Sequence, residues 1–368
     1  MIELAEVVRK HGPEYLEKFG NRMPHNHKRA LFAITACRTE EMGGHLEECD
    51  NHCGNVRYSY HSCKNGSCPK CHGADTKRWL EKRETELLPV PYFHLVFTLP
   101  AELREVVRSN QKALYAVLFQ AAIASLTKLG LDPKYIGGQL GMLTVLHTWT
   151  RAKEYHPHLH LLVPAGGLAK DGGWRPARKK FLVPVKALSP IFRAIFMKLA
   201  RKALPYETFP QEVWKKNWVV FSKPTFRNTK KVLHYLGRYV HRIAIANNSI
   251  LALENDHVTF RYQNSTTREW KTMRLAAMEF LRRFLQHVLP KGFHKVRYFG
   301  LLHPSNKATL KRLQLLLWEK DRRRTAAIEH EVAARTESVR VCPCCHEGIM
   351  VVISWLPRKS RSPPAGGE

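Results

Sequence analysis

Two closely spaced pairs of cysteines are the clearest chemical signal in the chain. Cys49 and Cys53 form one pair, and Cys68 and Cys71 form the other. Two such pairs joined by a short loop are the usual way to close a tetrahedral Zn²⁺ site with four thiolates. Such a site leaves no open coordination position, so its ion would be structural and would fold a polar segment that has no apolar core. The sequence therefore predicts a structural zinc on these four thiolates.

The same segment contains further side chains that could bind metal. Cys37, His45 and Cys63 could hold a second Zn²⁺, which would need a fourth ligand. Three more histidines lie nearby, namely His61, His52 and His72. We expect His61 to be that fourth ligand. In the alternative, Cys37 and Cys63 are only small buried side chains that bind no metal. The sequence therefore predicts one zinc ion in this segment or two.

A short cysteine run also lies near the C-terminus. Cys342 and Cys345 have the spacing of one zinc knuckle, and Cys344 lies between them. Because we find no second pair beside them, Cys344 and His346 would have to complete a third site. The alternative is a reactive thiol cluster without metal, and the sequence leaves both open.

A different kind of metal site is indicated at His158 and His160. They lie in the run HPHLHLLVP, which is apolar enough to be a strand. Side chains alternate along a strand, so both imidazoles share one face while Leu159 lies on the other. Two neutral imidazoles on one face are half of a site for a divalent ion.

A third ligand for this ion depends on a turn. If the chain turns near residues 152–153, His147 on the preceding strand comes to lie opposite His158 on the same face. His147 is therefore the candidate third ligand. His94, on the expected strand VPYFHLVFTLP, is the first alternative, and His156 is also possible.

Tyr235 and Tyr239 could supply a nucleophile. They are four residues apart on an expected helix over 228–242, so both phenols share one helical face. Such a pair often serves only core packing. Here, however, the helix also carries several cations, namely Lys230, Lys231, Arg238 and Arg242, with His234 and His241.

Those cations favour a reaction at phosphate. A phenol has a pKa of about 10, and nearby positive charge lowers the cost of forming phenolate. The same charge binds DNA phosphate, and a divalent ion on His158 and His160 would polarise the scissile phosphate. Attack by either tyrosine would give a 5′-phosphotyrosine link and a free 3′-hydroxyl.

The overall composition agrees with a nucleic-acid partner. The 368 residues include 60 Lys and Arg against 31 Asp and Glu, for a net charge of +29. Such an excess attracts polyanions. The charged N-terminus has no signal-peptide pattern, and no run of about 18 uncharged apolar residues predicts a membrane span. We therefore expect reduced, intracellular cysteines and no membrane partner.

The order of elements around the histidines predicts the fold class. From residue 89 to residue 163 the patterns read strand, helix, strand, strand, which is typical of a central antiparallel sheet with helices over one face, in the α+β class. Short strands also fit residues 243–273. We expect a zinc-binding DNA-recognition domain at 1–88, a nuclease core at 89–245, a β-rich and helical extension at 246–335, and a cysteine-bearing, partly disordered tail at 336–368.

The motifs together resemble a known family. FTLP, HPHLH and YLGRY are similar, in order, to the three motifs of HUH nucleases, which include replication initiators, relaxases and transposases. The run CRTEEMGGHLEEC through SCPKC, with LLPVPYFHLVFTLP after it, resembles the zinc-binding domain of rolling-circle transposases of the insertion-sequence ninety-one family. The resemblance spans Ala30 to His303.

That resemblance implies an HUH fold and a specific chemistry. His158 and His160 would hold Mg²⁺ or Mn²⁺, and both tyrosines would be nucleophiles, which suits successive strand transfers. The partner would be single-stranded DNA at the element ends and target, in the bacterial cytoplasm and nucleoid. Two alternatives remain: a plasmid or phage replication initiator with the same chemistry, and a non-catalytic zinc protein that binds DNA. The sequence leaves the oligomeric state unknown.

Overall fold

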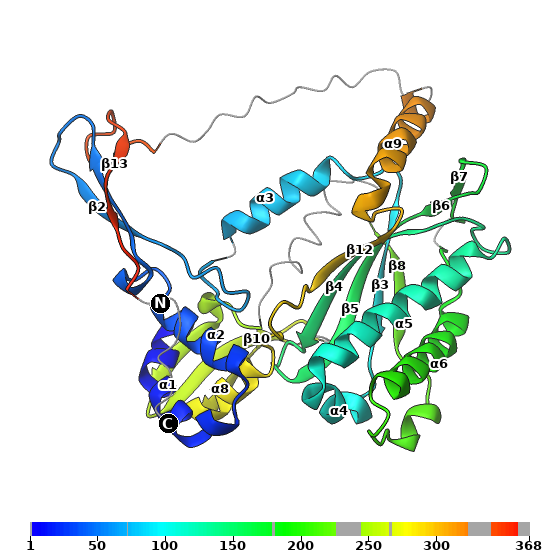
Figure 1. Cartoon of the computed structure of the whole chain (residues 1–368), viewed down its shortest axis with the longest axis horizontal. Helices are drawn as coiled ribbons and strands as arrows, with labels where there is room; N and C mark the ends of the chain where they lie inside the picture. Colours follow the sequence, from blue (N-terminus) through cyan, green and yellow to red (C-terminus); the bar gives the residue numbers. More distant parts are fainter. Residues whose placement is uncertain are drawn as a thin grey trace. The chain divides into compact units, whose positions relative to one another are not determined.

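The computed structural model describes residues 2–71, 73–178, 181–225, 244–264, 267–322 and 340–359, and it divides into two compact units (Figure 1). One unit combines Met1–Gly73, Ile245–Val288 and Ala327–Glu368, and the other combines Ala74–Ala244 and Leu289–Ala326. This grouping differs from the four consecutive segments expected from the sequence, because parts far apart along the chain gather in each unit.

A five-stranded antiparallel sheet forms the centre of the second unit, with the order β12-β4-β5-β3-β8 (Figure 1). Its strands are β3 (Tyr92–Thr98), β4 (Gly141–Trp149), β5 (Tyr155–Pro164), β8 (Val220–Pro224) and β12 (Val296–Gly300). The inner strands β4, β5 and β3 are almost wholly buried, because other elements cover both faces of the sheet. Their apolar runs in the sequence follow from that burial.

Two long helices, α5 (Gln111–Leu131) and α6 (Val185–Ala203), cover one face of this sheet (Figure 1). Leu95, Leu159 and Phe192 belong to the core between the helices and the sheet. Within the described residues, α5 is the one helix long and apolar enough to span a membrane. Most of the apolar part of α5 is buried in this core, so we interpret it as a core helix.

The opposite face of the sheet is covered by other elements. Tyr92, Leu143 and Leu162 pack there with Trp79 of α3 (Gly73–Glu84), whose indole N–H donates to the Tyr298 hydroxyl at 3.0 Å. Another helix, α9 (Lys307–Arg322), packs on the segment that leads into β3. The unit is completed by α4 (Arg104–Ser109) and the small hairpin of β6 (Gly166–Leu168) and β7 (Trp174–Pro176).

The first unit contains two helices from the N-terminus and a second antiparallel sheet. The helices are α1 (Leu4–Phe19) and α2 (His25–Ala36), and the sheet has the order β11-β10-β9. Its strands are β9 (Ile250–Glu254), β10 (His257–Gln263) and β11 (Trp270–Ala276), and α8 (Ala277–Leu285) follows directly.

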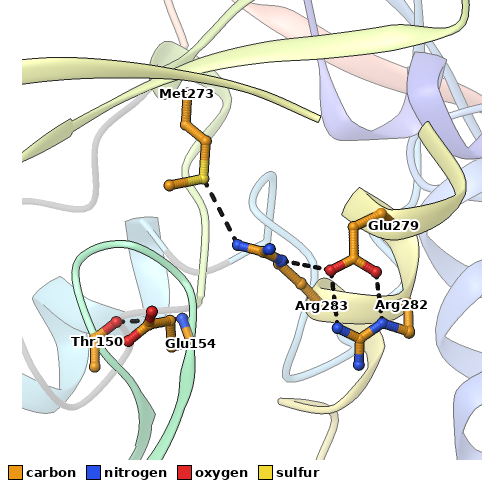
Figure 2. Close-up of polar contacts among 6 residues, drawn as sticks. All are labelled: Thr150, Glu154, Met273, Glu279, Arg282 and Arg283. Atoms are coloured by element: carbon orange, nitrogen blue, oxygen red, sulfur yellow. Dashed lines mark hydrogen bonds and ion pairs between the residues drawn. The ribbon is translucent and has the colours of Figure 1, made fainter. Parts of the chain in front are cut away.

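Helix α8 has one apolar and one charged face. Phe280 packs against Phe260 of β10, with ring centroids 5.8 Å apart. Figure 2 shows the charged face, where Glu279 accepts hydrogen bonds from Arg282 and Arg283. Arg283 also reaches the Met273 sulfur at 3.6 Å. The Phe280–Phe260 and Arg283–Met273 contacts connect α8 to the sheet beside it.

A third sheet links the two ends of the chain. Strand β1 (Gly44–Cys49) lies between β2 (Val56–Tyr60) and β13 (Met350–Leu356), and both neighbours are antiparallel to it. Figure 1 draws β13, in red, together with the blue N-terminal strands. The sequence predicted a cysteine-bearing, partly disordered tail at 336–368 and did not predict β13.

One expectation about local structure needs correction. The helix expected after the first strand of the region 89–163 is interrupted at Asn110, where α4 ends and α5 begins. Pro184 is the N-cap residue of α6, which begins at Val185. The mixture of helices and antiparallel sheets agrees with the expected α+β class.

Candidate metal centres

The hairpin of β4 and β5 brings two histidines face to face. His147 and His158 are direct partners in the antiparallel register. The chain reverses between Thr150 and Glu154, where the Glu154 N–H donates to the Thr150 hydroxyl at 3.2 Å (Figure 2) and Lys153 has a φ of 66°. The turn expected near residues 152–153 is therefore present, and it produces the expected pairing.

Three histidines gather on one face of this hairpin. One ring nitrogen from each of His147, His158 and His160 lies within 4.8 Å of the others. Leu159 belongs to the core beneath α5 and α6, so the trio lies on the opposite face of the sheet. His147 and His160 are buried, at 3% and 8% exposure.

Hydrogen bonds orient two of these rings. The Nδ1–H of His158 donates to the His156 carbonyl oxygen at 2.6 Å, which leaves Nε2 with its lone pair. Nδ1 of His160 lies 2.9 Å from Nε2 of His94, a neighbouring residue on β3. Second-sphere hydrogen bonds of this kind select the tautomer of a metal-binding imidazole.

Burial keeps the imidazoles near the trio neutral. Removal from water lowers the pKa of His158 to about 4 and that of His94 to about 4. A neutral imidazole offers the lone pair that a divalent ion needs. Lone pairs of neutral rings facing one another repel, and a cation between them removes that repulsion. The donor set therefore fits a divalent ion.

The two alternative ligands take other positions. His94 hydrogen-bonds to His160 instead of joining the trio, and His156 accepts from Arg104 at 3.2 Å. Among the described residues, the three-histidine group is His147, His158 and His160. His94 is thus a hydrogen-bond partner of His160, a position that the sequence did not suggest.

Four cysteines form a compact group beside the end of α2. The group is Cys37, Cys63, Cys68 and Cys71, with sulfurs all within 4.8 Å of one another. Cys37 Sγ lies 3.4 Å from Cys71 Sγ, and Cys63 Sγ lies 3.5 Å from the same atom. Hydrogen bonds from the Cys63 and Cys68 thiols lower the pKa of Cys37 to about 7, which favours thiolate in the group.

A second group of four cysteines combines the pair Cys49 and Cys53 with two cysteines from the C-terminal segment. Cys49 and Cys53 lie with Cys342 and Cys345, again with all sulfurs within 4.8 Å. The predicted combination of Cys49 and Cys53 with Cys68 and Cys71 is therefore wrong. The reason is the pairing of β1 with β13, which places Cys49 opposite Met350 and beside the tail turn.

The histidines proposed for a second zinc lie elsewhere. His45 Nε2 is 3.0 Å from a carboxylate oxygen of Glu47, and both His45 and His61 contact the Trp355 ring. Within the described residues neither histidine belongs to a group of potential metal ligands. His52 is exposed near Glu48, and His72 lies outside the described residues.

Known proteins can now be compared with this geometry. Residues 141–309 match the family model described as "Putative transposase", and residues 7–99 match the model described as "Transposase zinc-binding domain". The protein named "Putative transposase y4qJ" from Sinorhizobium fredii (strain NBRC 101917 / NGR234) is 36% identical over 380 residues, covering 95% of this chain and 94% of its own length.

A second relative is the "Transposase for insertion sequence element IS801" of Pseudomonas savastanoi pv. phaseolicola. It is 30% identical over 292 residues, which cover 73% of this chain and 68% of the relative. The chain belongs to the insertion-sequence ninety-one family of transposases. No solved structure matches it.

The candidate site residues of this transposase fall into different matched ranges. The zinc-binding model contains the cysteines from Cys37 to Cys71, and the other model contains the histidine trio and the tyrosine pair. Cys342 and Cys345 lie beyond both ranges. The presence of a zinc-binding domain and of cysteine clusters supports structural zinc.

The nucleophile and DNA-contact candidates lie outside the described residues. Residues 226–243 contain Tyr235 and Tyr239, and with them the four proposed DNA-binding cations Lys230, Lys231, Arg238 and Arg242. Their roles in this transposase stay predictions from the sequence.

Proposed function

We propose that this transposase cuts and rejoins single-stranded DNA through 5′-phosphotyrosine intermediates, as a metal-dependent HUH enzyme of rolling-circle transposition. The observation that carries the proposal is the histidine trio on one face of an antiparallel hairpin. Family membership supports DNA as the substrate, and the central antiparallel sheet with the long helices α5 and α6 on one face suits an HUH core.

Metal binding would fall to His147, His158 and His160. A Mg²⁺ or Mn²⁺ ion held there would act as a Lewis acid on the scissile phosphate. His94 would serve as a positioning residue, because Nδ1 of His160 can donate to Nε2 of His94 and leave the other nitrogen of His160 for the ion.

The tyrosines would carry out the covalent step. The phenolate oxygen of Tyr235 or Tyr239 attacks phosphorus, the bond from phosphorus to the 3′ oxygen breaks, and that oxygen leaves as a 3′-hydroxyl after taking a proton. The 5′-phosphate stays on the tyrosine, so the bond energy is kept for rejoining. Two tyrosines would allow one attack at each of two strand ends.

Positive charge would serve both binding and catalysis. The cations at 230, 231, 238 and 242 would contact phosphate and stabilise phenolate beside it. The cysteine-bearing segment would recognise DNA as a zinc-folded module. We expect the protein to act on DNA in the bacterial cytoplasm, at the nucleoid.

An adduct assay tests this function. The full-length protein is mixed with Mn²⁺ and single-stranded DNA from the end of the element, then denatured and run on a gel. We expect a protein–DNA adduct that resists denaturation and that disappears in a Tyr235→Phe, Tyr239→Phe double variant. Tyr206→Phe is the matched control, because Tyr206 is almost fully exposed. An adduct that persists in the double variant contradicts the nucleophile assignment.

A further inference from the structure

The cysteine group at the C-terminal tail is a metal site that lies partly outside the matched zinc-binding range. We propose that Cys49, Cys53, Cys342 and Cys345 bind a second structural Zn²⁺, which fastens the tail to the N-terminal segment. Its members come from distant parts of the chain, since Cys49 and Cys345 are 296 positions apart in the sequence. The inference does not depend on the proposed cleavage chemistry.

The distances between sulfurs suit a tetrahedral zinc site. Cys49 Sγ lies 3.6 Å from Cys345 Sγ, and Cys53 Sγ lies 3.6 Å from Cys342 Sγ. Four thiolates placed about 2.3 Å from one zinc ion are about 3.8 Å apart at the corners of a tetrahedron. A disulfide needs its sulfurs at about 2.0 Å, and none of the nine cysteines forms a disulfide in this structure.

Hydrogen-bond donors surround the tail sulfurs. The backbone N–H of Cys344 lies 3.4 Å from Cys342 Sγ, and that of Gly348 lies 3.3 Å from Cys345 Sγ. The Asn55 side-chain amide donates to Cys342 Sγ at 3.2 Å. Donors aimed at sulfur stabilise the thiolate form, which is the form that binds zinc.

The backbone of the tail is shaped to bring the two halves close. A Cβ atom on Gly348 would lie 2.5 Å from Cys49 Sγ and 2.7 Å from Asp50 Oδ1. Only glycine permits this approach, so the tail turn fits closely over the end of β1. The Ile349 N–H donates to the same Asp50 oxygen at 2.6 Å.

Strand pairing holds the halves in register. β13 follows the tail knuckle directly and pairs along the length of β1. Arg340, just before the knuckle, lies 3.0 Å from the buried carboxylate of Glu47 in β1. Each half of the group is therefore anchored on a strand of the same sheet, as the two knuckles of a metal-bound ribbon require.

Cys344 provides a control within the same turn. It lies between the two tail ligands in sequence, yet it is exposed and does not belong to the group. From the sequence alone, Cys344 and His346 were the candidates to complete a metal site with Cys342 and Cys345. In the structure Cys49 and Cys53 take that place.

Zinc content and thiol protection test the proposal on the full chain. We expect two zinc ions per chain by elemental analysis, and one in a Cys342→Ser, Cys345→Ser double variant. Cys344→Ser should retain two. In the unaltered protein, alkylation under native conditions should modify Cys344 first, and the other eight cysteines only after zinc is removed by a chelator.

The alkylation arm needs no substitution, so it remains decisive if the double variant fails to fold. Rapid native alkylation of Cys342 or Cys345 in zinc-loaded protein would overturn the proposal. So would retention of two zinc ions in the double variant, or a mass showing a disulfide between two members of the group.

Discussion

The histidine trio and the cysteine groups offer metal ligands of opposite kinds. Each cysteine group offers four sulfurs, which would complete a tetrahedron and exclude further ligands. The trio offers three nitrogens on one face of a sheet, so an ion there would keep open positions for a phosphate oxygen. The number and the chemical type of the ligands therefore distinguish a structural metal site, which stabilises the fold, from a site where a bound ion can take part in a reaction.

The largest expected effect comes from opening the cysteine group beside α2. Cys68→Ser removes one of the four thiolate ligands. In small zinc domains the free energy of zinc binding, about 10–16 kcal/mol, contributes directly to the stability of the folded state. We expect the loss of one zinc per chain and a clear fall in melting temperature. Cys344→Ser should change neither, and equal behaviour of the two variants would contradict a structural role.

The histidine trio should respond in the opposite way. In a His158→Ala, His160→Ala double variant we expect DNA cleavage to fall by about a thousandfold or more, since a Lewis acid supplies several kcal/mol at the transition state. Zinc content and melting temperature should remain close to those of the unaltered protein. DNA binding, measured by fluorescence anisotropy, should largely survive, and its collapse would make these histidines structural.

His94 should have a graded effect on the same centre. Loss of a second-sphere partner typically lowers metal affinity by about 10–100-fold, so His94→Phe should need more Mn²⁺ for half-maximal binding in a calorimetric titration. His94→Gln can still accept from Nδ1 of His160 and should recover much of that affinity. Equal affinities of the Phe and Gln variants would show that His94 only fills space.

The smallest effect tests the fit of the tail turn. Gly348→Ala places a methyl group against Cys49 Sγ and Asp50, which should cost about 1–3 kcal/mol by overpacking. We expect the group of Cys49, Cys53, Cys342 and Cys345 to lose its zinc to a chelator faster than in the unaltered protein, with no change at the other group. Gly66→Ala is the matched control, because Gly66 lies in the loop of the other group with open space around it. If both variants lose zinc at the same rate, the close approach at Gly348 has no role.

The histidine hairpin could be foreseen because its determinants are local. Alternation within one strand places His158 and His160 on one face, and a short turn brings in His147. The hydrogen bond from His160 to His94 could not be foreseen, because it depends on which strand lies beside β5. Sequence analysis could identify the histidines that are candidate metal ligands, but it could not give the order of the strands that carry them in the sheet.

The cysteine groups show where local reasoning fails. Proximity along the chain suggested that Cys49 and Cys53 share an ion with Cys68 and Cys71. The actual grouping follows from the pairing of β1 with β13, whose residues are about 300 positions apart. Nothing in the spacing of either pair carries that information. Spacing identified the four paired cysteines as ligand candidates, whereas Cys37 and Cys63 were candidates only because they lie in the same segment.

The pairing of β1 with β13 also has a consequence for how the protein is made. Residues 44–49 leave the ribosome about 300 residues before their partner strand at 350–356. The N-terminal unit therefore cannot finish folding until β13 has been synthesised. A product shortened by a frameshift or an early stop codon would lack β13 and leave one edge of β1 unpaired, and such an edge is a template for aggregation.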